Sequence, residues 1–415
     1  MAKDLFHDEI LEDEQRLYFL SYEDNLDEVK KLINCGMVKL NFIFELCPYT
    51  GQSNSTPLSV AAHMGHLEVE QLLLEGGAIP DETYKELNQE KLCKAAKEGK
   101  IEEVTRLLSC EGLDKDCIVG EYHSTPLKLA SDNGHKHVVK LLLQFGADPN
   151  KSGQCGFTPL YNASSRGHSD MVKILLDFGA DTSKALKDGW TPLHTAAKEN
   201  HKHIVQLLLN RGADPNVPSN LQTTNGCTPL HFAAFYGHSD VVSTLLNEGA
   251  EINNQSKYGL TALHAATGKG LNNVVQNLLD RGANPNLQNA TAGTPLHVAA
   301  YYGHRELAVL LLNAGADPNL QNAQRSTPLH WAAWKGDKDL AQILLDRGAN
   351  PNAQSTGSWT PLHYAAQEDQ NVVVQQLLHK GAQPNITNED GNTPWDIAME
   401  RNYLDIALAL TFTDT

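Results

Sequence analysis

Apolar residues along this chain recur at spacings that indicate short helices rather than strands. In the stretch that begins at Thr294, the residues Leu296, Ala299 and Ala300 fall at i, i+3 and i+4, on one stripe of a helix. A second helix follows, and we expect it to bury Leu307, Val309, Leu310 and Leu311. Neither helix is long enough to be stable alone, so each must pack against neighbouring helices.

Polar and turn-forming residues mark the ends of these two helices. Thr294 stands where a helix N-cap belongs, and Pro295 follows at the first helical position, where an N–H is not needed. We expect Gly303 and Gly315 to end the helices by taking a positive φ. The Ala-Asp-Pro-Asn segment at 316–319 then favours a turn that leads into a hairpin-like finger. The pattern predicts a helix–turn–helix unit with a protruding finger.

This unit recurs along the chain. From Thr125 onward the opening threonine returns every 33 residues, with one step of 37. Ten threonines begin the phrase, nine of them as Thr-Pro: Thr56, Thr125, Thr158, Thr191, Thr228, Thr261, Thr294, Thr327, Thr360 and Thr393. Two weaker copies have helix starts near residues 15 and 90, which makes twelve units. A fixed period of this length indicates one short unit stacked on itself.

The phrase Thr-Pro-Leu-His-x-Ala at this period resembles the ankyrin repeat. The resemblance covers nearly the whole chain. It implies an all-α fold, an ankyrin-repeat α-solenoid of stacked helix-turn-helix units with hairpin-like fingers. We expect residues 1–415 to form a single array, with irregular N-terminal repeats at 1–124, regular repeats at 125–392 and a C-terminal capping repeat at 393–415.

Two segments depart from the period. The connection between the first two units is longer than the period and carries Phe42, Ile43, Phe44 and Tyr49, which we expect to be buried on the repeats or on a partner. The segment 217–224 adds four residues, is polar, and predicts an extended finger or a mobile loop. The irregular first 124 residues indicate either an N-terminal cap or a separate recognition surface.

Charge and cysteine usage narrow the functional classes. A net charge of −17 argues against binding to nucleic-acid backbones and to anionic lipid. Acidic residues crowd the N-terminus, as a solvated end cap or as a patch for a basic partner: Asp4, Asp8, Glu9, Glu12, Asp13 and Glu14. We find no run of about 18 apolar residues and no signal-peptide pattern, so we expect no membrane span. The seven irregularly spaced cysteines indicate reduced thiols and a cytoplasmic or nuclear protein.

Twelve of the 18 histidines follow the repeat rather than a catalytic or metal-binding pattern. Six follow the leucine of the phrase: His194, His231, His264, His297, His330 and His363. Six more lie seven residues later: His66, His135, His168, His201, His238 and His304. In ankyrin-like units such histidines typically hydrogen-bond backbone between neighbouring repeats, so their implied role is structural.

No enzyme signature stands out in the sequence. The segment 267–270, Thr-Gly-Lys-Gly, lacks the upstream glycine and the following Ser or Thr of a phosphate-binding loop. We also find no recognisable catalytic motif and no zinc-ligand spacing. We therefore expect neither catalysis nor a cofactor, a metal or a small-molecule substrate.

The resemblance implies that a partner contacts the finger tips and the two residues after the paired alanines of the first helix. Large aromatic residues gather at these helix positions: Phe235, Tyr236, Tyr301, Tyr302 and Trp334. Lys269 and Lys335 flank them, and Trp190, Tyr258 and Trp359 lie on nearby fingers. Aromatic residues are enriched in interface hot spots. The alternative is that these rings fill gaps between stacked helices.

The function that the resemblance implies is a non-catalytic protein–protein interaction scaffold or adaptor. Such a protein would bind a protein partner on its concave face and finger tips. Two alternatives stay open. One is an inhibitor that occludes the active site of a partner enzyme. The other is a bacterial effector that acts as an adaptor in the cytosol of a eukaryotic host cell.

Overall fold

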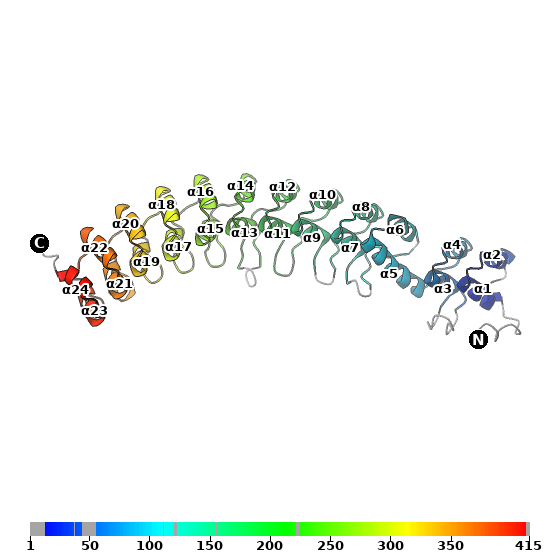
Figure 1. The fold of residues 1–415 in the computed structure, drawn as a ribbon. Helices are drawn as coiled ribbons and strands as arrows, with labels where there is room; N and C mark the ends of the chain where they lie inside the picture. The colour runs from blue at the N-terminus through cyan, green and yellow to red at the C-terminus, as the bar shows by residue number, and fades with distance from the viewer. Residues whose placement is uncertain are drawn as a thin grey trace. The chain divides into compact units, whose positions relative to one another are not determined.

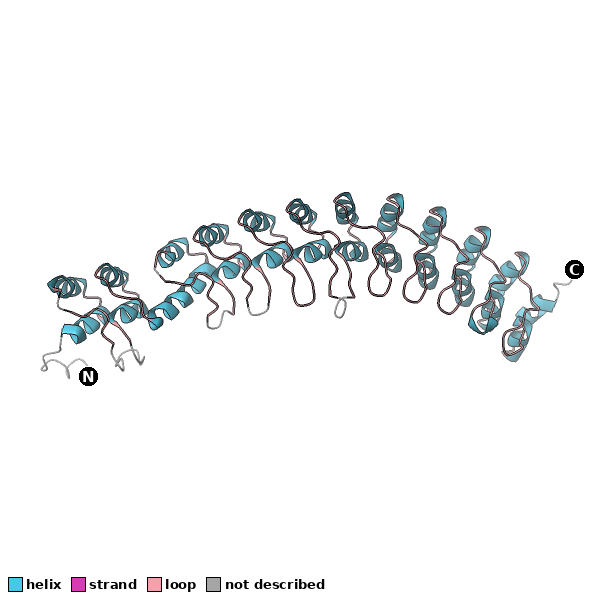
Figure 2. Cartoon of the chain, turned by 180° about the vertical axis from the view of Figure 1, so that it is seen from behind, coloured by secondary structure: helices cyan, strands magenta, loops and turns pink. Residues whose placement is uncertain are grey.

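A computed structural model describes residues 13–36, 38–43, 55–110, 112–119, 123–153, 156–220 and 225–411 of the chain. It confirms the all-α prediction, because the described residues form helices joined by loops (Figure 2). Contacts divide the chain into two compact units. The first comprises Met1–Ala163 with Asp170–Asp181, and the second comprises Ser164–Ser169 with Thr182–Thr415. That all repeats form one continuous array stays a prediction.

The helices occur in pairs along the chain. The first ten are α1 (Asp13–Tyr22), α2 (Leu26–Cys35), α3 (Pro57–Met64), α4 (Leu67–Glu75), α5 (Glu82–Glu98), α6 (Ile101–Leu108), α7 (Pro126–Asp132), α8 (Lys136–Gln144), α9 (Pro159–Ser165) and α10 (Ser169–Asp177). We call the odd-numbered member of each pair the first helix and the even-numbered member the second helix. The loop that precedes each opening threonine is the finger.

The pairs of the second unit are the most regular. They are α11 (Pro192–Lys198), α12 (Lys202–Asn210), α13 (Pro229–Tyr236), α14 (Ser239–Asn247), α15 (Ala262–Gly268), α16 (Asn272–Asp280), α17 (Pro295–Tyr302), α18 (Arg305–Asn313), α19 (Pro328–Lys335), α20 (Lys338–Asp346), α21 (Pro361–Gln367), α22 (Asn371–His379), α23 (Pro394–Glu400) and α24 (Leu404–Thr411), with a short 3-10 turn at Thr356–Ser358. In this unit the first helices form one row and the second helices another (Figure 1). The fingers project from the first row, away from the second.

The predicted helix ends are confirmed in the repeat that begins at Thr294. The Thr294 hydroxyl accepts the backbone N–H of His297, and Gly303 ends α17 with φ 76°. The burial prediction for α18 is partly wrong, because Val309 and Leu310 are only half-buried. Ala308 and Leu312 are buried instead, together with the predicted Leu307 and Leu311. One face of α18 packs inward, and residues 309 and 310 lie at its margin.

The first unit departs from two expectations. The helix expected to start near residue 90 begins at Glu82, where the Asp81 side chain accepts the Tyr84 N–H at 2.7 Å. Residues 82–91 contain no Gly or Pro and are rich in good helix formers, so α5 extends through the place of a finger. In the loop between α2 and α3, Ile43 is 55% exposed and is therefore not buried on the repeats, so only the alternative of burial on a partner stays a prediction for it.

Several residues that the sequence singled out lie outside the described part of the chain. They are Asp4, Asp8, Glu9 and Glu12 of the acidic N-terminus, Phe44 and Tyr49 of the long connection, and residues 221–224 of the polar insertion.

A histidine in each phrase joins one repeat to the next. The backbone N–H of Thr294 donates to Nδ1 of His297 at 3.1 Å, and Nε2 lies 2.9 Å from the Ser326 carbonyl of the next repeat. Because a backbone N–H can only donate, Nδ1 is the acceptor and Nε2 carries the proton. The same bridge recurs between His194 and Cys227, His231 and Leu260, His264 and Gly293, His330 and Trp359, and His363 and Asn392. The predicted structural role of these six histidines is confirmed.

Side chains at two further repeat positions, a histidine and an asparagine, also bond between adjacent repeats. Nε2 of His238 lies 2.8 Å from the Lys198 carbonyl of the preceding repeat. Matching backward bonds join His66 to Tyr22, His135 to Lys97 and His201 to Ser165. In the turn after α16, the Asn286 side-chain amide donates to the Gly315 carbonyl at 2.9 Å and accepts the Asp317 N–H at 2.8 Å. Adjacent repeats are therefore held by polar bonds as well as by apolar packing.

The bridging histidines are buried, which disfavours their charged form. Burial lowers the pKa to about 4 from an ordinary value of 6.5 in His194, His264, His297 and His330. Burial also lowers the pKa of His231 and His363. At neutral pH all six imidazoles are therefore neutral, as their two hydrogen bonds require.

We expect the free energy of unfolding to fall as the pH is lowered from about 6.5 to about 4. In this interval the unfolded chain binds protons that the folded imidazoles do not, so the stability present above pH 6.5 is lost as the unfolded state protonates. The loss by pH 4 is on the order of 3 kcal/mol for each of the four histidines with a pKa near 4. Urea unfolding followed by circular dichroism across this pH range measures it.

A His264→Ser variant provides the control. It copies Ser59, whose Oγ accepts the Thr56 N–H at 2.8 Å in an earlier repeat, so it keeps the helix cap and removes one titrating imidazole. The wild type should be more stable than the variant near neutral pH, and the difference should shrink as the pH falls to about 4. A difference that stays constant over this range would contradict the assignment of a low pKa to His264.

Candidate functional site

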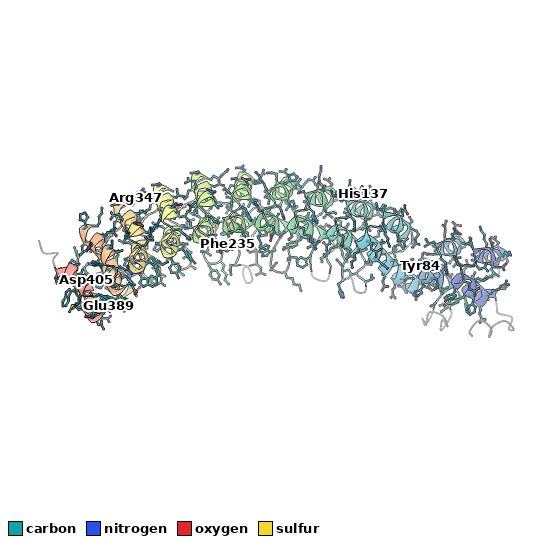
Figure 3. The ribbon with its side chains drawn as sticks, viewed as in Figure 1. Tyr84, His137, Phe235, Arg347, Glu389 and Asp405 are labelled. Carbon is teal, nitrogen blue, oxygen red and sulfur yellow. The ribbon has the colours of Figure 1, made fainter. Side chains whose placement is uncertain are left out.

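The aromatic residues that the sequence singled out lie at the ends of first helices in the second unit. Figure 3 places Phe235 on α13, in the row of first helices. The exposed fractions of the side chains are 40% for Phe235, 47% for Tyr236, 45% for Tyr301, 56% for Tyr302 and 40% for Trp334. The paired alanines before them are fully buried. We call these five residues the aromatic face.

Neighbouring rings of the aromatic face contact one another in two groups, one on α13 and one on α17 and α19. Phe235 and Tyr236 pack edge to face with centroids 5.1 Å apart, and Tyr301 and Tyr302 do so at 5.0 Å. Trp331 continues the cluster on α19, with its centroid 5.2 Å from that of Tyr301. Sequence reasoning missed Trp331, although a large ring one helical turn before Trp334 was a visible signal. The rings therefore pack together and still keep roughly half of their surface exposed.

Lysine side chains lie over these rings. Nζ of Lys269 is 4.4 Å from the Phe235 centroid, and Nζ of Lys335 is 5.1 Å from the Tyr301 centroid. Lys335 also donates to the Tyr301 carbonyl. A cation above an aromatic face is attracted by the ring quadrupole. The two lysines that the sequence placed beside the aromatic residues thus belong to the same surface.

The three finger aromatics have different surroundings. Tyr258 is 48% exposed. Trp190 and Trp359 are half-buried: the Trp190 ring lies 4.5 Å from that of Phe232, and the Trp359 ring lies 5.3 Å from that of Tyr364. Of these three residues, Tyr258 offers the most free surface to a partner.

A cavity of about 670 Å³ opens beside the aromatic face. Its walls include Phe232, Phe235 and Tyr236 from α13 and Val298 and Tyr302 from α17. Between them, α15 carries the small residues Ala265 and Gly268 at positions where α13 carries Phe232 and Phe235. We call this cavity the aromatic hollow. Its volume is in the range of pockets that bind ligands or side chains.

The backbone conformation at position 268 does not require a glycine. It lies within α15, and a Cβ added to it would meet only Val298, at an ordinary contact distance of 3.6 Å. The hollow therefore exists because a side chain is absent, and a larger residue at position 268 would enter it.

Among the described residues, no three or more His, Cys, Asp or Glu side chains group so that they could hold a metal ion. None of the described helices is both long enough and apolar enough to cross a membrane.

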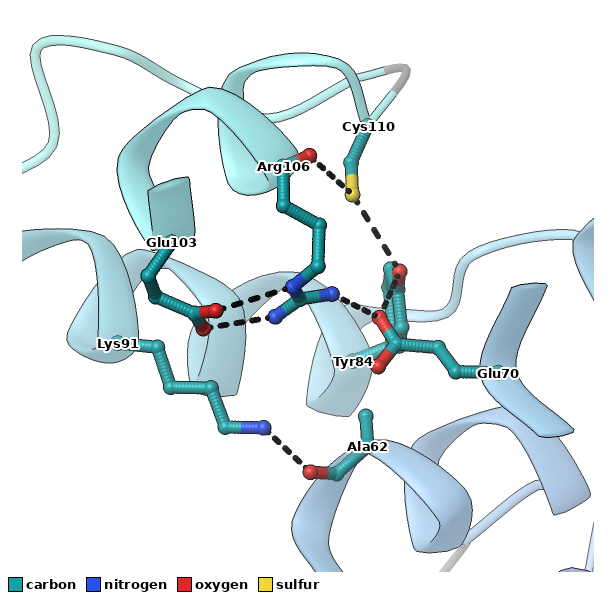
Figure 4. Close-up of polar contacts among 7 residues, drawn as sticks. All are labelled: Ala62, Glu70, Tyr84, Lys91, Glu103, Arg106 and Cys110. Carbon is teal, nitrogen blue, oxygen red and sulfur yellow. Dashed lines mark hydrogen bonds and ion pairs between the residues drawn. The ribbon is translucent and has the colours of Figure 1, made fainter. Parts of the chain in front are cut away.

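A buried polar cluster in the first unit was not anticipated from the sequence (Figure 4). Glu70 on α4 is only 1% exposed, at a position where the nine later Thr-initiated repeats carry Val or Ala. Its Oε1 accepts the Tyr84 hydroxyl at 2.8 Å and Nη1 of Arg106 at 3.1 Å. Arg106 also donates to both oxygens of Glu103 on α6. A glutamate at a repeat position that otherwise holds Val or Ala was the sequence signal that could have located the cluster.

The charges of this cluster depend on one another. Burial, assisted by the Glu70 charge, raises the pKa of Tyr84. Burial acts to lower the pKa of Arg106, but its bonds to Glu103 and the nearby Glu70 outweigh that effect and raise it. A buried carboxylate is costly unless it is paired and hydrogen-bonded. Arg106, which lies on α6, therefore forms ion pairs both with Glu70 on α4 and with Glu103 on its own helix.

We expect Arg106→Ala to destabilise the first unit by about 3 kcal/mol, because it leaves the buried Glu70 charge without its cation. Adding Glu70→Val, the residue of most other repeats, should recover most of that loss. Tryptophan fluorescence would not report on the first unit, because all five tryptophans lie at or beyond residue 190. Hydrogen exchange of peptides from 55–110 is therefore the suitable measurement.

Arg16→Ala is the matched control for this pair of variants. It breaks the exposed ion pair with Glu28 in the same unit and should change exchange little. Equal protection in the Arg106→Ala protein and the wild type would contradict the pairing role of Arg106.

Comparison with protein families agrees with this architecture. A three-copy ankyrin-repeat profile matches residues 80–153, 127–219, 216–289 and 269–355. A many-copy profile matches residues 344–398, and the single-repeat profile matches residues 53–85. A search of curated proteins finds no match to this chain. Because the family profiles cover most of the sequence, the chain belongs to the ankyrin-repeat family.

Proposed function

We propose that this protein is a non-catalytic scaffold or adaptor that binds a protein partner through the aromatic face and the adjoining fingers. Ankyrin repeats are general protein–protein interaction modules, which supports the coarse part of the proposal. The observation that carries the choice of surface is the exposure of five large aromatic side chains on α13, α17 and α19. Clustered exposed aromatics of this kind are typical of interface hot spots.

The roles of the histidines support a non-catalytic function. In the repeat of His297, Nδ1 accepts from Thr294 and Nε2 bonds the Ser326 carbonyl. An imidazole bound at both nitrogens has no free lone pair with which to act as a general base. Five other histidines are held in the same way.

We expect the double substitution Tyr301→Ala and Trp334→Ala to abolish partner binding and to leave folding nearly unchanged. Both side chains are 40–45% exposed, so the free energy of unfolding should fall by no more than about 1–2 kcal/mol. Capture from a cell lysate, quantified by mass spectrometry against the wild type, measures the loss of partners.

Phe178→Ala is the matched control, because Phe178 is also 40% exposed but follows α10, outside the aromatic face. It should retain the captured partners. If the double variant is folded and captures the same proteins as the wild type, the aromatic face is not the binding surface. If the double variant unfolds, the rings serve packing instead.

A further inference from the structure

Between residues 225 and 358 the fingers and first helices carry a net positive charge, although the protein as a whole is acidic. Within residues 225–358, the fingers and first helices carry Lys257, Lys269, Arg325 and Lys335 and no carboxylate. The nine carboxylates of this stretch lie on second helices, at their ends or in the turns that follow them. Within this stretch the fingers and first helices are therefore cationic, whereas the second helices and the turns after them carry a net negative charge.

These cations have no acidic partner in the part of the chain that the structure describes. Among the described residues, none of the four has a carboxylate oxygen at ion-pair distance. Three of them lie over rings instead, with Nζ of Lys257 5.7 Å from the Tyr258 centroid and Lys269 and Lys335 placed as described above. Unpaired cations on a protein of net charge −17 provide electrostatic complementarity to an acidic ligand.

The aromatic hollow has the shape left by missing rings. Helix α19 carries Trp331 and Trp334 at the positions that Ala265 and Gly268 occupy in α15. The hollow is bordered by Phe235 on one side and Tyr302 on the other, and Lys269 lines its edge. An aromatic side chain of a partner protein would contact the rings of Phe235 and Tyr302 there. The residues next to it in the partner's sequence would lie close to Lys269.

We propose that the aromatic hollow binds one aromatic side chain of an acidic, extended segment of the partner protein. The ring lies over Gly268 between the rings of α13 and α17, and the carboxylates that flank it in sequence face Lys269 and the neighbouring cations. This inference rests on the proposed function and names the chemistry of the partner. The apolar anchor supplies the affinity, and the cations select acidic segments over basic ones.

Fluorescence anisotropy with the full chain tests the proposal directly. The probe is a fluorescein-labelled peptide with a central tryptophan and three Asp or Glu residues on each side. We expect saturable binding that weakens with added salt. Peptides with alanine in place of tryptophan, or with lysine in place of the acidic residues, should bind at least about tenfold more weakly.

Substitutions at position 268 locate the anchor. Gly268→Tyr copies Tyr301, the residue at the same position of α17, and fills the hollow, so it should weaken the peptide by at least about tenfold. Gly268→Ala adds only a methyl group and should stay within about twofold of the wild type. Ala265→Trp, which copies Trp331, fills the hollow from a second position if the first variant folds poorly.

The possible results separate this inference from the proposed function. Equal binding to the wild type and to the folded Gly268→Tyr protein, equal binding of the lysine peptide, or no binding of the acidic peptide would each overturn the inference. In another outcome, Gly268→Tyr captures the natural partners while the Tyr301→Ala and Trp334→Ala variant does not. That result would support the aromatic face as the binding surface and contradict the proposal that the hollow holds the anchoring side chain. If neither variant loses partners, both proposals fail.

Discussion

The stack depends on a buried, neutral imidazole that is hydrogen-bonded at both nitrogens. In the repeat that begins at Thr294, His297 closes the helix cap through Nδ1 and reaches the next repeat through Nε2. Only one neutral tautomer satisfies both bonds, because the threonine N–H and the distant carbonyl have fixed roles. Each repeat thus completes the polar bonding of its neighbour, and the second unit grows by adjacent contacts rather than around one large core.

This constraint leaves few positions free to vary. In the phrases that begin at Thr191, Thr228, Thr294, Thr327 and Thr360, the threonine, proline, leucine, histidine and paired alanines all serve the helix cap, the bridge to the next repeat or the core. Variation is concentrated on the side of the first helix that faces the fingers, and there α13, α17 and α19 present rings whereas α15 presents Ala265 and Gly268. The aromatic hollow therefore arises because one first helix carries small residues where its neighbours carry rings, while the backbone of the repeat stays the same.

The first unit shows what happens when a core position itself changes. Glu70 replaces the usual Val or Ala, and the chain accommodates its charge with Tyr84 from the extended α5 and Arg106 from α6. A buried ion pair of this kind contributes little net stability compared with apolar packing, but it makes α4 and α6 dependent on each other. The regular repeats contact their neighbours through a recurring set of residues, whereas α4 and α6 are joined through Glu70, at a position where the nine later Thr-initiated repeats carry Val or Ala.

Local chemistry determined much of the fold in advance: the Thr294 cap, the Gly303 terminus and the bridging histidines depend on residues a few positions apart and on a fixed period. The early start of α5 at Glu82 escaped prediction because a run of good helix formers overrode a weak copy of the repeat. The half-burial of Trp190 and Trp359 was decided by tertiary packing on Phe232 and Tyr364. The sequence by itself determined which aromatic residues stand at the ends of first helices, but only the tertiary structure decided that they enclose a hollow. A cavity is enclosed by side chains of several helices at once. The distances between those helices depend on how they pack, and no single stretch of sequence specifies them.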